Sequence, residues 1–314
     1  MAKASFRWLR IVGILLFIWI AFQIDWLAVW KLLGGIQPVY LFGYFCAFFV
    51  AAFLKVYRLR WFLNCLGYRV AFKDVYRSVI EPAFYGSITP ARLGEFSKVI
   101  YLKRFGLSTR LAWGVVLMER LVDLSVLLIA GAAGFFYFTV SDAANETLAL
   151  AVFLVLAALL FVSLTRLSTL ARLGGGMLGR IPWNKAALVE VLSLNEGLDR
   201  IGKFSAIIIL PVSVFVLLLS FLQLSLLGQA INVSISWVYL GLAYVYSSLA
   251  SLLPLSVGGM GTREAVYIGL LYKQGISPDV AITISLLDGL VLSLVAQLLL
   301  FLPLALKRGG YGKD

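Results

Sequence analysis

The sequence predicts an all-α, polytopic membrane protein, and three observations support this fold class. Of the 314 residues, 62% are hydrophobic and 13% are charged, whereas a soluble domain has about 45–50% apolar and about 25% charged residues. The mean hydropathy is +0.98. The apolar residues also occur in long continuous runs, which excludes the short alternating segments of a β-barrel.

Six apolar runs approach or exceed the length of about 20 residues that a helix needs to cross a bilayer. They are Trp8–Trp30, Pro38–Tyr57, Leu111–Val140, Thr147–Leu164, Ser205–Ile231 and Asp279–Leu306. We expect each to form a full span. The first run is not followed by an Ala-x-Ala cleavage site, so we expect it to be retained and not removed as a signal peptide.

Two further apolar stretches, Val75–Tyr101 and Trp237–Tyr272, are each interrupted by Gly, Ser, Thr and Pro. Irregular backbone at membrane depth is tolerated only where protein or a water-filled cavity satisfies its polar groups. We therefore interpret both stretches as re-entrant helical hairpins.

The distribution of basic residues predicts the topology. With both termini in the cytoplasm, six crossings and two hairpins, 23 of the 27 Lys and Arg residues lie on the cytoplasmic side, as the positive-inside rule requires. Only Lys31, Arg263 and Lys273 lie outside, and Arg120 is within a span. The net charge of +12 then reflects cytoplasmic loops and not nucleic-acid binding, and the expected location is the cytoplasmic (inner) membrane.

The chain is expected to form one transmembrane domain over residues 1–314, built from two halves at 1–140 and 147–306. Each half contains two spans, a hairpin and a third span, in opposite orientations, which is the pattern of an inverted repeat. Between spans, residues 166–203 have helical apolar periodicity with charges opposite. This segment is either an amphipathic insertion on the cytoplasmic membrane surface or a docking helix for a partner.

The tip of the first hairpin has the pattern of a capped helix start. Thr89 is a good N-cap, Pro90 suits the first helical position, and Arg92 follows on the first turn. The free N–H groups of such a helix, together with Arg92, favour an anion. Glu95 is spaced to pair with Arg92 and with Lys98 at i, i+3.

The tip of the second hairpin is rich in glycine. The glycines that permit a tight turn and close backbone approach are Gly258, Gly259 and Gly261. Thr262 is placed to cap a helix that begins at Arg263, with Glu264 next to it. This tip resembles a phosphate cradle, but it lacks the Gly-Lys-Ser/Thr ending of a P-loop. A bare structural turn is the alternative.

The third long span after the N-terminus carries three charged residues, Glu119, Arg120 and Asp123. They are about 13–18 Å from the start of the span, near the bilayer midplane. Arg120 and Asp123 are spaced to neutralise each other, which leaves Glu119 in need of a partner, for which Arg92 and Lys98 are the candidates. A structural ion network is the alternative to a functional one.

Asp288 is a further charge within the last span, and we expect Arg263 to be its partner. Four carboxylates are available for proton coupling. They are Glu95, Glu119, Glu264 and Asp288.

The composition excludes several kinds of chemistry. The chain has no histidine, so histidine-based acid–base catalysis and histidine-ligated metals are excluded. Cys46 and Cys65 are too few and too far apart for a four-cysteine zinc site. We expect no metal, no cofactor and no catalytic residue, so the chain is not expected to be an enzyme. A membrane-embedded transferase is a minor alternative.

Three motifs occur in a fixed order: Thr89 to Lys98, Glu119 to Asp123, and Pro254 to Glu264. Together they resemble the flippase-like transmembrane domain of lysylphosphatidylglycerol synthases, which is also found alone as an integral membrane protein. The resemblance covers nearly the whole chain. It implies a multi-span domain that translocates lipids such as anionic phospholipids, aminoacylated lipids or polyprenyl-phosphate sugars, and it implies homodimers. In the synthases, lysyl transfer belongs to a separate soluble aminoacyl-transferase domain. We do not expect that domain in this chain, so we expect no lysyl transfer.

Two hypotheses for the function follow. In the first, the chain moves a phosphate-bearing lipid between leaflets, with Arg92 and Arg263 on the phosphate, and it is driven passively or by an ion because the sequence has no nucleotide-binding motif. In the second, it is an accessory or scaffold subunit that binds lipid for a membrane enzyme and docks through residues 166–203.

Overall fold

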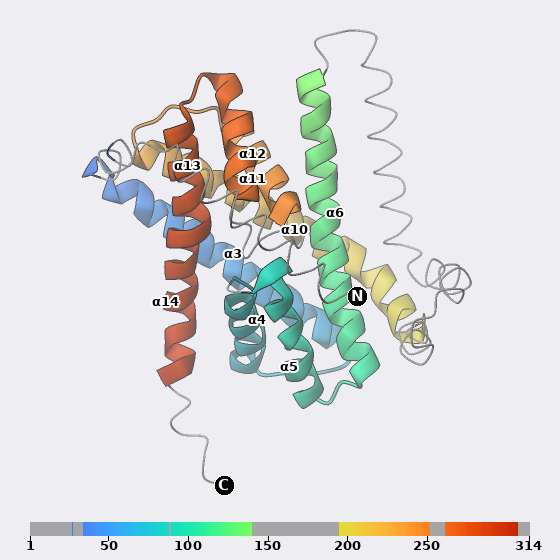
Figure 1. The fold of residues 1–314 in the computed structure, drawn as a ribbon. Coiled ribbons are helices and arrows are strands. Elements are labelled where there is room, and N and C mark those ends of the chain that lie inside the picture. The colour runs from blue at the N-terminus through green and yellow to red at the C-terminus, as the bar shows by residue number, and fades with distance from the viewer. Residues whose placement is uncertain (1–26, 28–33, 88, 140–194, 252–260, 307–314) are drawn as a thin grey trace, which may run out of the picture. The chain divides into compact units, whose positions relative to one another are not determined.

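The computed structural model describes residue 27 and residues 34–87, 89–139, 195–251 and 261–306. Regular secondary structure in these ranges is entirely helical (Figure 1), in agreement with the predicted fold class. Several predicted features lie outside the described residues: nearly all of the first span, the fourth span, residues 166–194 of the insertion, and Gly258 and Gly259.

Four of the predicted spans fall within the described residues, and all four are helical. They correspond to α3 (Pro38–Cys65), α6 (Thr109–Thr139), α10 (Asn195–Ala230) and the C-terminal helix from Pro278 to Leu306. Three helices of the described part are long and apolar enough to cross a membrane, namely Pro38–Cys65, Ile209–Ala230 and Pro278–Leu304. Helix α10 starts at Asn195, so the end of the predicted surface insertion is continuous with the span that follows it.

Each of the two interrupted stretches contains more than one helix in its described residues, and residues 88 and 252–260 lie outside the described part. The first consists of α4 (Phe72–Ser87), the 3₁₀-helix η1 (Pro90–Ser97) and α5 (Lys98–Arg104). The second consists of α11 (Trp237–Ser251), α12 (Thr262–Leu271) and the short 3₁₀-helix η2 (Tyr272–Gln274).

The last span is not a uniform α-helix. It begins as α13 (Pro278–Leu286), widens into a π-helical segment, η3 (Leu287–Leu292), and continues as α14 (Ser293–Leu306). π-helical turns within α-helices are rare and occur often at functional sites.

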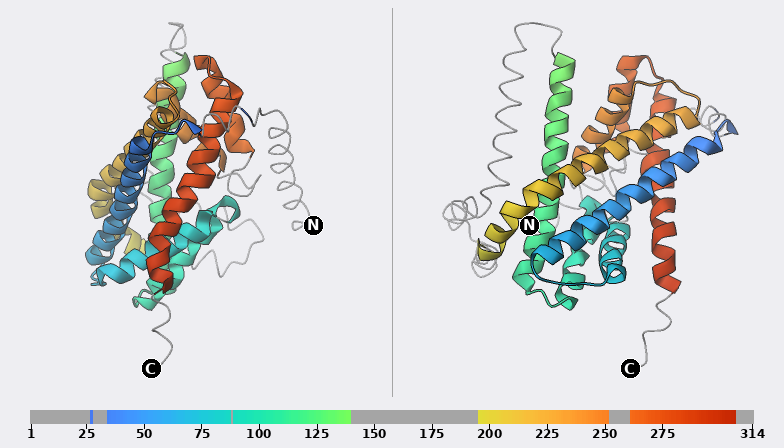
Figure 2. Two further views of the ribbon diagram at one scale, coloured as in Figure 1. Left: turned by 90° about the vertical axis from the view of Figure 1, so that its left-hand side faces the viewer. Right: turned by 180° about the vertical axis from the view of Figure 1, so that it is seen from behind.

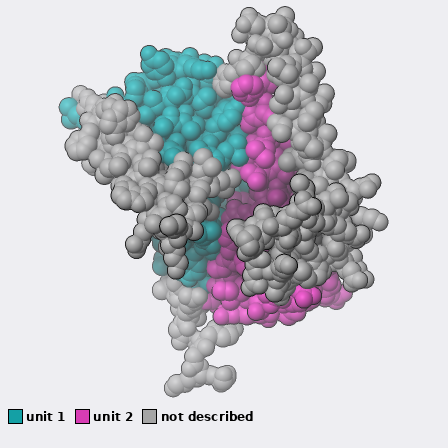
Figure 3. Space-filling view, turned by 45° about the vertical axis from the view of Figure 1, so that its right-hand side comes forward, with its two compact units in different colours: residues 1–53, 79–95, 216–314 teal, residues 54–78, 96–215 magenta. Residues whose placement is uncertain are grey.

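The chain forms two compact units (Figure 3). Unit 1 contains residues 1–53, 79–95 and 216–314, and unit 2 contains residues 54–78 and 96–215. Each unit takes residues from both predicted repeat halves.

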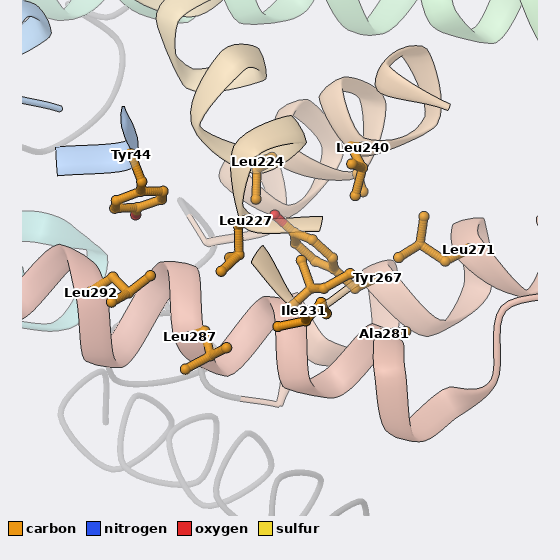
Figure 4. Close-up of a cluster of buried hydrophobic side chains, with 12 residues drawn as sticks. Tyr44, Leu224, Leu227, Ile231, Leu240, Tyr267, Leu271, Ala281, Leu287 and Leu292 are labelled. Carbon is orange, nitrogen blue, oxygen red and sulfur yellow. The ribbon is translucent and has the colours of Figure 1, made fainter. Parts of the chain in front are cut away.

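Unit 1 has a continuous apolar core (Figure 4). The beginning of α3 contributes Tyr44, the end of α10 contributes Leu227, and α12 contributes Tyr267, all fully buried. The two long helices run antiparallel here, because the Gln37 N–H donates to the Ala230 carbonyl at 2.9 Å, and the two views in Figure 2 show these ends side by side. This packing brings the start of α3 to the C-terminal span.

Unit 2 packs α5 against α6. The rings of Phe96 and Trp113 are 5.8 Å apart between centroids, and Leu102 and Met118 are fully buried. The contact holds the polar residues of α5 close to those of α6.

Candidate functional site

Thr89 organises the tip of the first hairpin. Its hydroxyl accepts a hydrogen bond from the Gly94 N–H at 2.7 Å and donates to the Tyr85 carbonyl at 2.9 Å. Gly94 lies so close to the main chain of Tyr85 that a side chain at this position would collide with it. The end of α4 and the beginning of η1 are thereby fixed to each other.

A helix begins at Pro90, as predicted, but it is the 3₁₀-helix Pro90–Ser97, and the α-helix begins only at Lys98. An N-cap side chain binds the second or third N–H of its helix, whereas the Thr89 hydroxyl binds the N–H five residues later. Thr89 therefore does not act as a standard N-cap for the helix that begins at Pro90.

Arg92 adopts an unusual backbone conformation. Its φ is 54°, in the left-handed region that is uncommon for residues other than glycine and costs free energy. Its Nη1 lies 4.0 Å from Oε1 of Glu95, as the i, i+3 spacing predicts, while half of its side chain remains exposed. The hairpin therefore holds Arg92 in a strained position at its tip.

The tip of the second hairpin begins with Gly261, which has a φ of 84°. Its N–H donates to Oε2 of Glu264 at 2.6 Å, and this contact satisfies a main-chain donor at the start of α12. The helix starts at Thr262, so the prediction that Thr262 caps a helix beginning at Arg263 is wrong by one residue. Glycine occupies the cap position because it alone adopts this φ without strain.

Arg263 is held by the last span. Its Nη2 donates to the main-chain carbonyl of Ser285 at 2.7 Å, and its Nε donates to the Ser285 hydroxyl at 3.2 Å. The same hydroxyl donates to Oε1 of Glu264 at 3.0 Å, and this oxygen lies 3.7 Å from the Arg263 Nε. Three neighbouring groups thus orient one guanidinium.

The π-helical segment provides the space for Arg263. A β-carbon added to Gly289 would coincide with the guanidinium of Arg263. At this segment the main-chain hydrogen bonds change from i→i+4 to i→i+5, and the carbonyl that accepts the guanidinium, Ser285, lies just before it. Sequence reasoning did not identify Ser285 or Gly289 as part of the site. The only signal was that the serine and the glycine lie close to Asp288 in a largely apolar span.

Asp288 is buried beside this position, with 8% of its surface exposed. Its Oδ1 accepts a hydrogen bond from the Tyr44 hydroxyl at 2.8 Å. The expected partner of Asp288, Arg263, makes its hydrogen bonds to Ser285 and acts on the Asp288 carboxylate through its charge. Arg92 is a further cation whose charge acts on the same carboxylate.

Unit 2 contains a separate network of buried charges. The guanidinium of Arg58 binds Asp123 with both terminal nitrogens, at 2.5 and 3.0 Å, and donates to the Ser213 hydroxyl at 2.6 Å. It also lies 3.6 Å from Glu119. The Lys98 ammonium donates to the other oxygen of Glu119 at 2.8 Å, which confirms Lys98 as a partner of Glu119.

The predicted pair of Arg120 and Asp123 is wrong, because Asp123 forms its ion pair with Arg58. The topology prediction counted Arg58 among the cytoplasmic basic residues, yet it is only 4% exposed. Helix α3 extends eight residues beyond the predicted end of its apolar run at Tyr57, and Arg58 therefore lies within the helix. The sequence contains no local signal for this pair, since the two residues are 65 positions apart.

Comparisons with known proteins agree with this architecture. The sequence model of one protein family, the lysylphosphatidylglycerol synthase transmembrane region, matches residues 7–300. The chain is also 23% identical to the UPF0104 membrane protein MJ1595 of Methanocaldococcus jannaschii, over 88% of each chain. No solved structure matches it. The chain is therefore an integral membrane protein that belongs to the family of the lysylphosphatidylglycerol synthase transmembrane region.

Proposed function

We propose that this protein is a lipid translocase that binds the phosphate of a lipid headgroup and carries it between the leaflets of the plasma membrane. The lipid is an anionic phospholipid, an aminoacyl-phospholipid or a polyprenyl-phosphate lipid. The acyl or isoprenyl chains stay in the bilayer while the headgroup passes through the protein.

One observation carries this proposal. The guanidinium of Arg263, on α12, is held by Ser285 and Glu264 at the π-helical segment of the apolar last span. A charge within a membrane segment is expensive and marks a functional site. A guanidinium suits a phosphate because its planar fork makes two parallel hydrogen bonds. The strained backbone of Arg92, at the tip of the other hairpin, supports a second contact.

The two tips suggest how the headgroup would move. In the predicted topology the hairpins enter from opposite faces of the membrane, and both of their arginines interact with Asp288. Each hairpin would then close one side of a shared site, as in transporters built from inverted repeats.

The test uses the full chain in phosphatidylcholine liposomes with a trace of fluorescent phosphatidylglycerol and an impermeant quencher outside. Without transport the quencher reaches only the outer leaflet, and with transport it reaches nearly all of the probe. We expect rapid movement without ATP for the wild type, and slow movement for Arg92→Ala and Arg263→Ala. Arg263→Lys keeps the charge but not the fork, so it should recover only part of the rate.

Lys273→Ala is the matched control, because Lys273 is an exposed basic residue in η2, directly after α12. It should move lipid at the wild-type rate. Normal movement by both arginine variants would show that the site is wrong. Stoichiometric lipid binding without movement would instead support the accessory-subunit hypothesis.

A further inference from the structure

Asp288 differs from Glu95, Glu119 and Glu264 in its direct partner. Within the part of the chain that the structure describes, it accepts a hydrogen bond from a neutral group, the Tyr44 hydroxyl, at 2.8 Å. It is 8% exposed and lies in the π-helical segment of the last span. Burial without a direct cationic partner disfavours the charged form of a carboxylate.

The other three candidate carboxylates each contact a cation. Glu119 binds Lys98 at 2.8 Å. Glu264 lies 3.7 Å from Arg263, and its two oxygens also accept hydrogen bonds from the Gly261 N–H and the Ser285 hydroxyl. Glu95 lies 4.0 Å from Arg92 and is partly exposed. Among these four carboxylates, Asp288 is therefore the one that is held directly by a neutral group and not by a cation.

Groups from several helices act on Asp288. Tyr44 comes from α3, Arg263 and Tyr267 come from α12, and Arg92 comes from η1. Tyr244 of α11 in turn faces Tyr44 and Tyr267. Arg263 also lies beside Glu264, and Arg92 lies beside Glu95, so Asp288 shares the positive charge of the two arginines with two other carboxylates. These are the same two arginines to which we assign the lipid phosphate.

We propose that Asp288 is a proton-binding site coupled to the binding of an anionic lipid headgroup. When a phosphate binds Arg263 and Arg92, it takes up their positive charge and adds a negative charge near Asp288. One proton from water then binds a carboxylate oxygen of Asp288, which changes its charge from −1 to 0, and the proton is released when the lipid leaves. This inference rests on the proposed function and specifies its coupling ion.

The proposal fixes the sign of the pH dependence. If one proton is taken up for each lipid bound, the affinity for the lipid rises by up to about tenfold for each unit by which the pH falls. The affinity for the lipid depends on pH in the range where Asp288 is ionised in the free protein and protonated in the complex. This dependence disappears at low pH, where Asp288 is already protonated before the lipid binds.

The experiment measures binding of dioctanoyl-phosphatidylglycerol to the full chain in detergent by titration calorimetry, from mildly acidic to mildly alkaline pH. The phosphodiester of this probe does not titrate in that range, so any pH dependence belongs to the protein. Each titration is repeated in two buffers with different ionisation enthalpies, which gives the number of protons taken up. For the wild type we expect uptake approaching one proton and a Kd that rises with pH.

Asp288→Asn should bind the probe without proton uptake, with a Kd that is independent of pH and close to that of the wild type at low pH. Asp279→Asn is the matched control, because Asp279 lies in the first turn of α13, nine residues before Asp288; it should keep the wild-type pH dependence of the Kd. Tyr44→Phe keeps the carboxylate but removes its hydrogen bond, so the pH-dependent range should move to higher pH.

The outcomes distinguish the two proposals. If the wild type binds the probe but Asp288→Asn keeps the wild-type proton uptake, the coupling site is wrong and the proposed function stands. An unmoved range in Tyr44→Phe also argues against the coupling site. If the wild type does not bind the probe at any pH, both proposals fail.

Discussion

The guanidinium of Arg263 lies against the α-carbon of Gly289, in the space that a side chain at position 289 would fill. The two residues belong to different helices, α12 and the π-helical segment of the last span. Gly289 is adjacent to Asp288 in the chain, so the guanidinium lies beside the main chain that carries this buried carboxylate. The glycine is needed for the space it leaves.

Gly289→Ala should therefore weaken lipid binding almost as much as Arg263→Ala does, because the added methyl group displaces the guanidinium. Charge-assisted hydrogen bonds are worth about 1.5–3 kcal/mol, so the Kd for dioctanoyl-phosphatidylglycerol should rise about 10- to 150-fold. The control is Gly269→Ala in α12, where nothing lies within 4 Å of an added β-carbon. Wild-type binding by Gly289→Ala would show that Arg263 does not contact the lipid from this position.

Arg58→Met should strongly destabilise the protein. The substitution leaves Asp123 without its bidentate partner and removes one of two cations from Glu119. Loss of one partner from a buried ion pair costs about 3–5 kcal/mol, which should appear as a large drop in the thermal midpoint in detergent.

Arg60→Ala provides the comparison for Arg58. Arg60 is on the same helix and lies over the ring of Phe72, 5.8 Å from its centroid, a contact worth about 0.5–1 kcal/mol at an exposed site. Similar thermal midpoints for the two variants would contradict the importance of the Arg58 network.

Lys98 and Glu119 should show strong coupling in a double-mutant cycle. Lys98→Met and Glu119→Gln each leave a partly or fully buried charge with fewer partners, whereas the double variant removes both charges of the 2.8 Å pair. We expect a coupling free energy of about 0.5–3 kcal/mol from unfolding measurements. Lys103→Met, at the exposed end of α5, should be additive with Glu119→Gln. If the effects of Lys98→Met and Glu119→Gln on the free energy of unfolding are additive, the pair does not contribute to stability.

Cysteine labelling tests the topology with both termini in the cytoplasm. In a background carrying Cys46→Ala and Cys65→Ser, which removes both exposed thiols, an impermeant maleimide added to intact cells should label Asn145→Cys. It should label Arg180→Cys only after the membrane is permeabilised. Labelling of both positions in intact cells would contradict the layout of spans and hairpins.

Local properties of the sequence determined much of this protein. Hydrophobicity and run length are local, so they predicted the helices α3 and α10, and Gly, Ser, Thr and Pro predicted that the stretch Val75–Tyr101 is not one continuous α-helix. The pair of Arg92 and Glu95 was predictable because both residues lie on one short segment. The family motifs also lie within short segments, which is why the family could be identified from them.

The tertiary structure decided which charges meet. Arg58 and Asp123 are 65 positions apart, and Tyr44 and Asp288 are 244 apart, so helix packing and not spacing selects them as partners. Local spacing favoured Arg120 for Asp123, but Arg58 on another helix offers two aligned nitrogens to the same carboxylate. The contact of Arg263 with Gly289 is likewise a property of the packed structure, because it joins α12 to the π-helical segment of the last span.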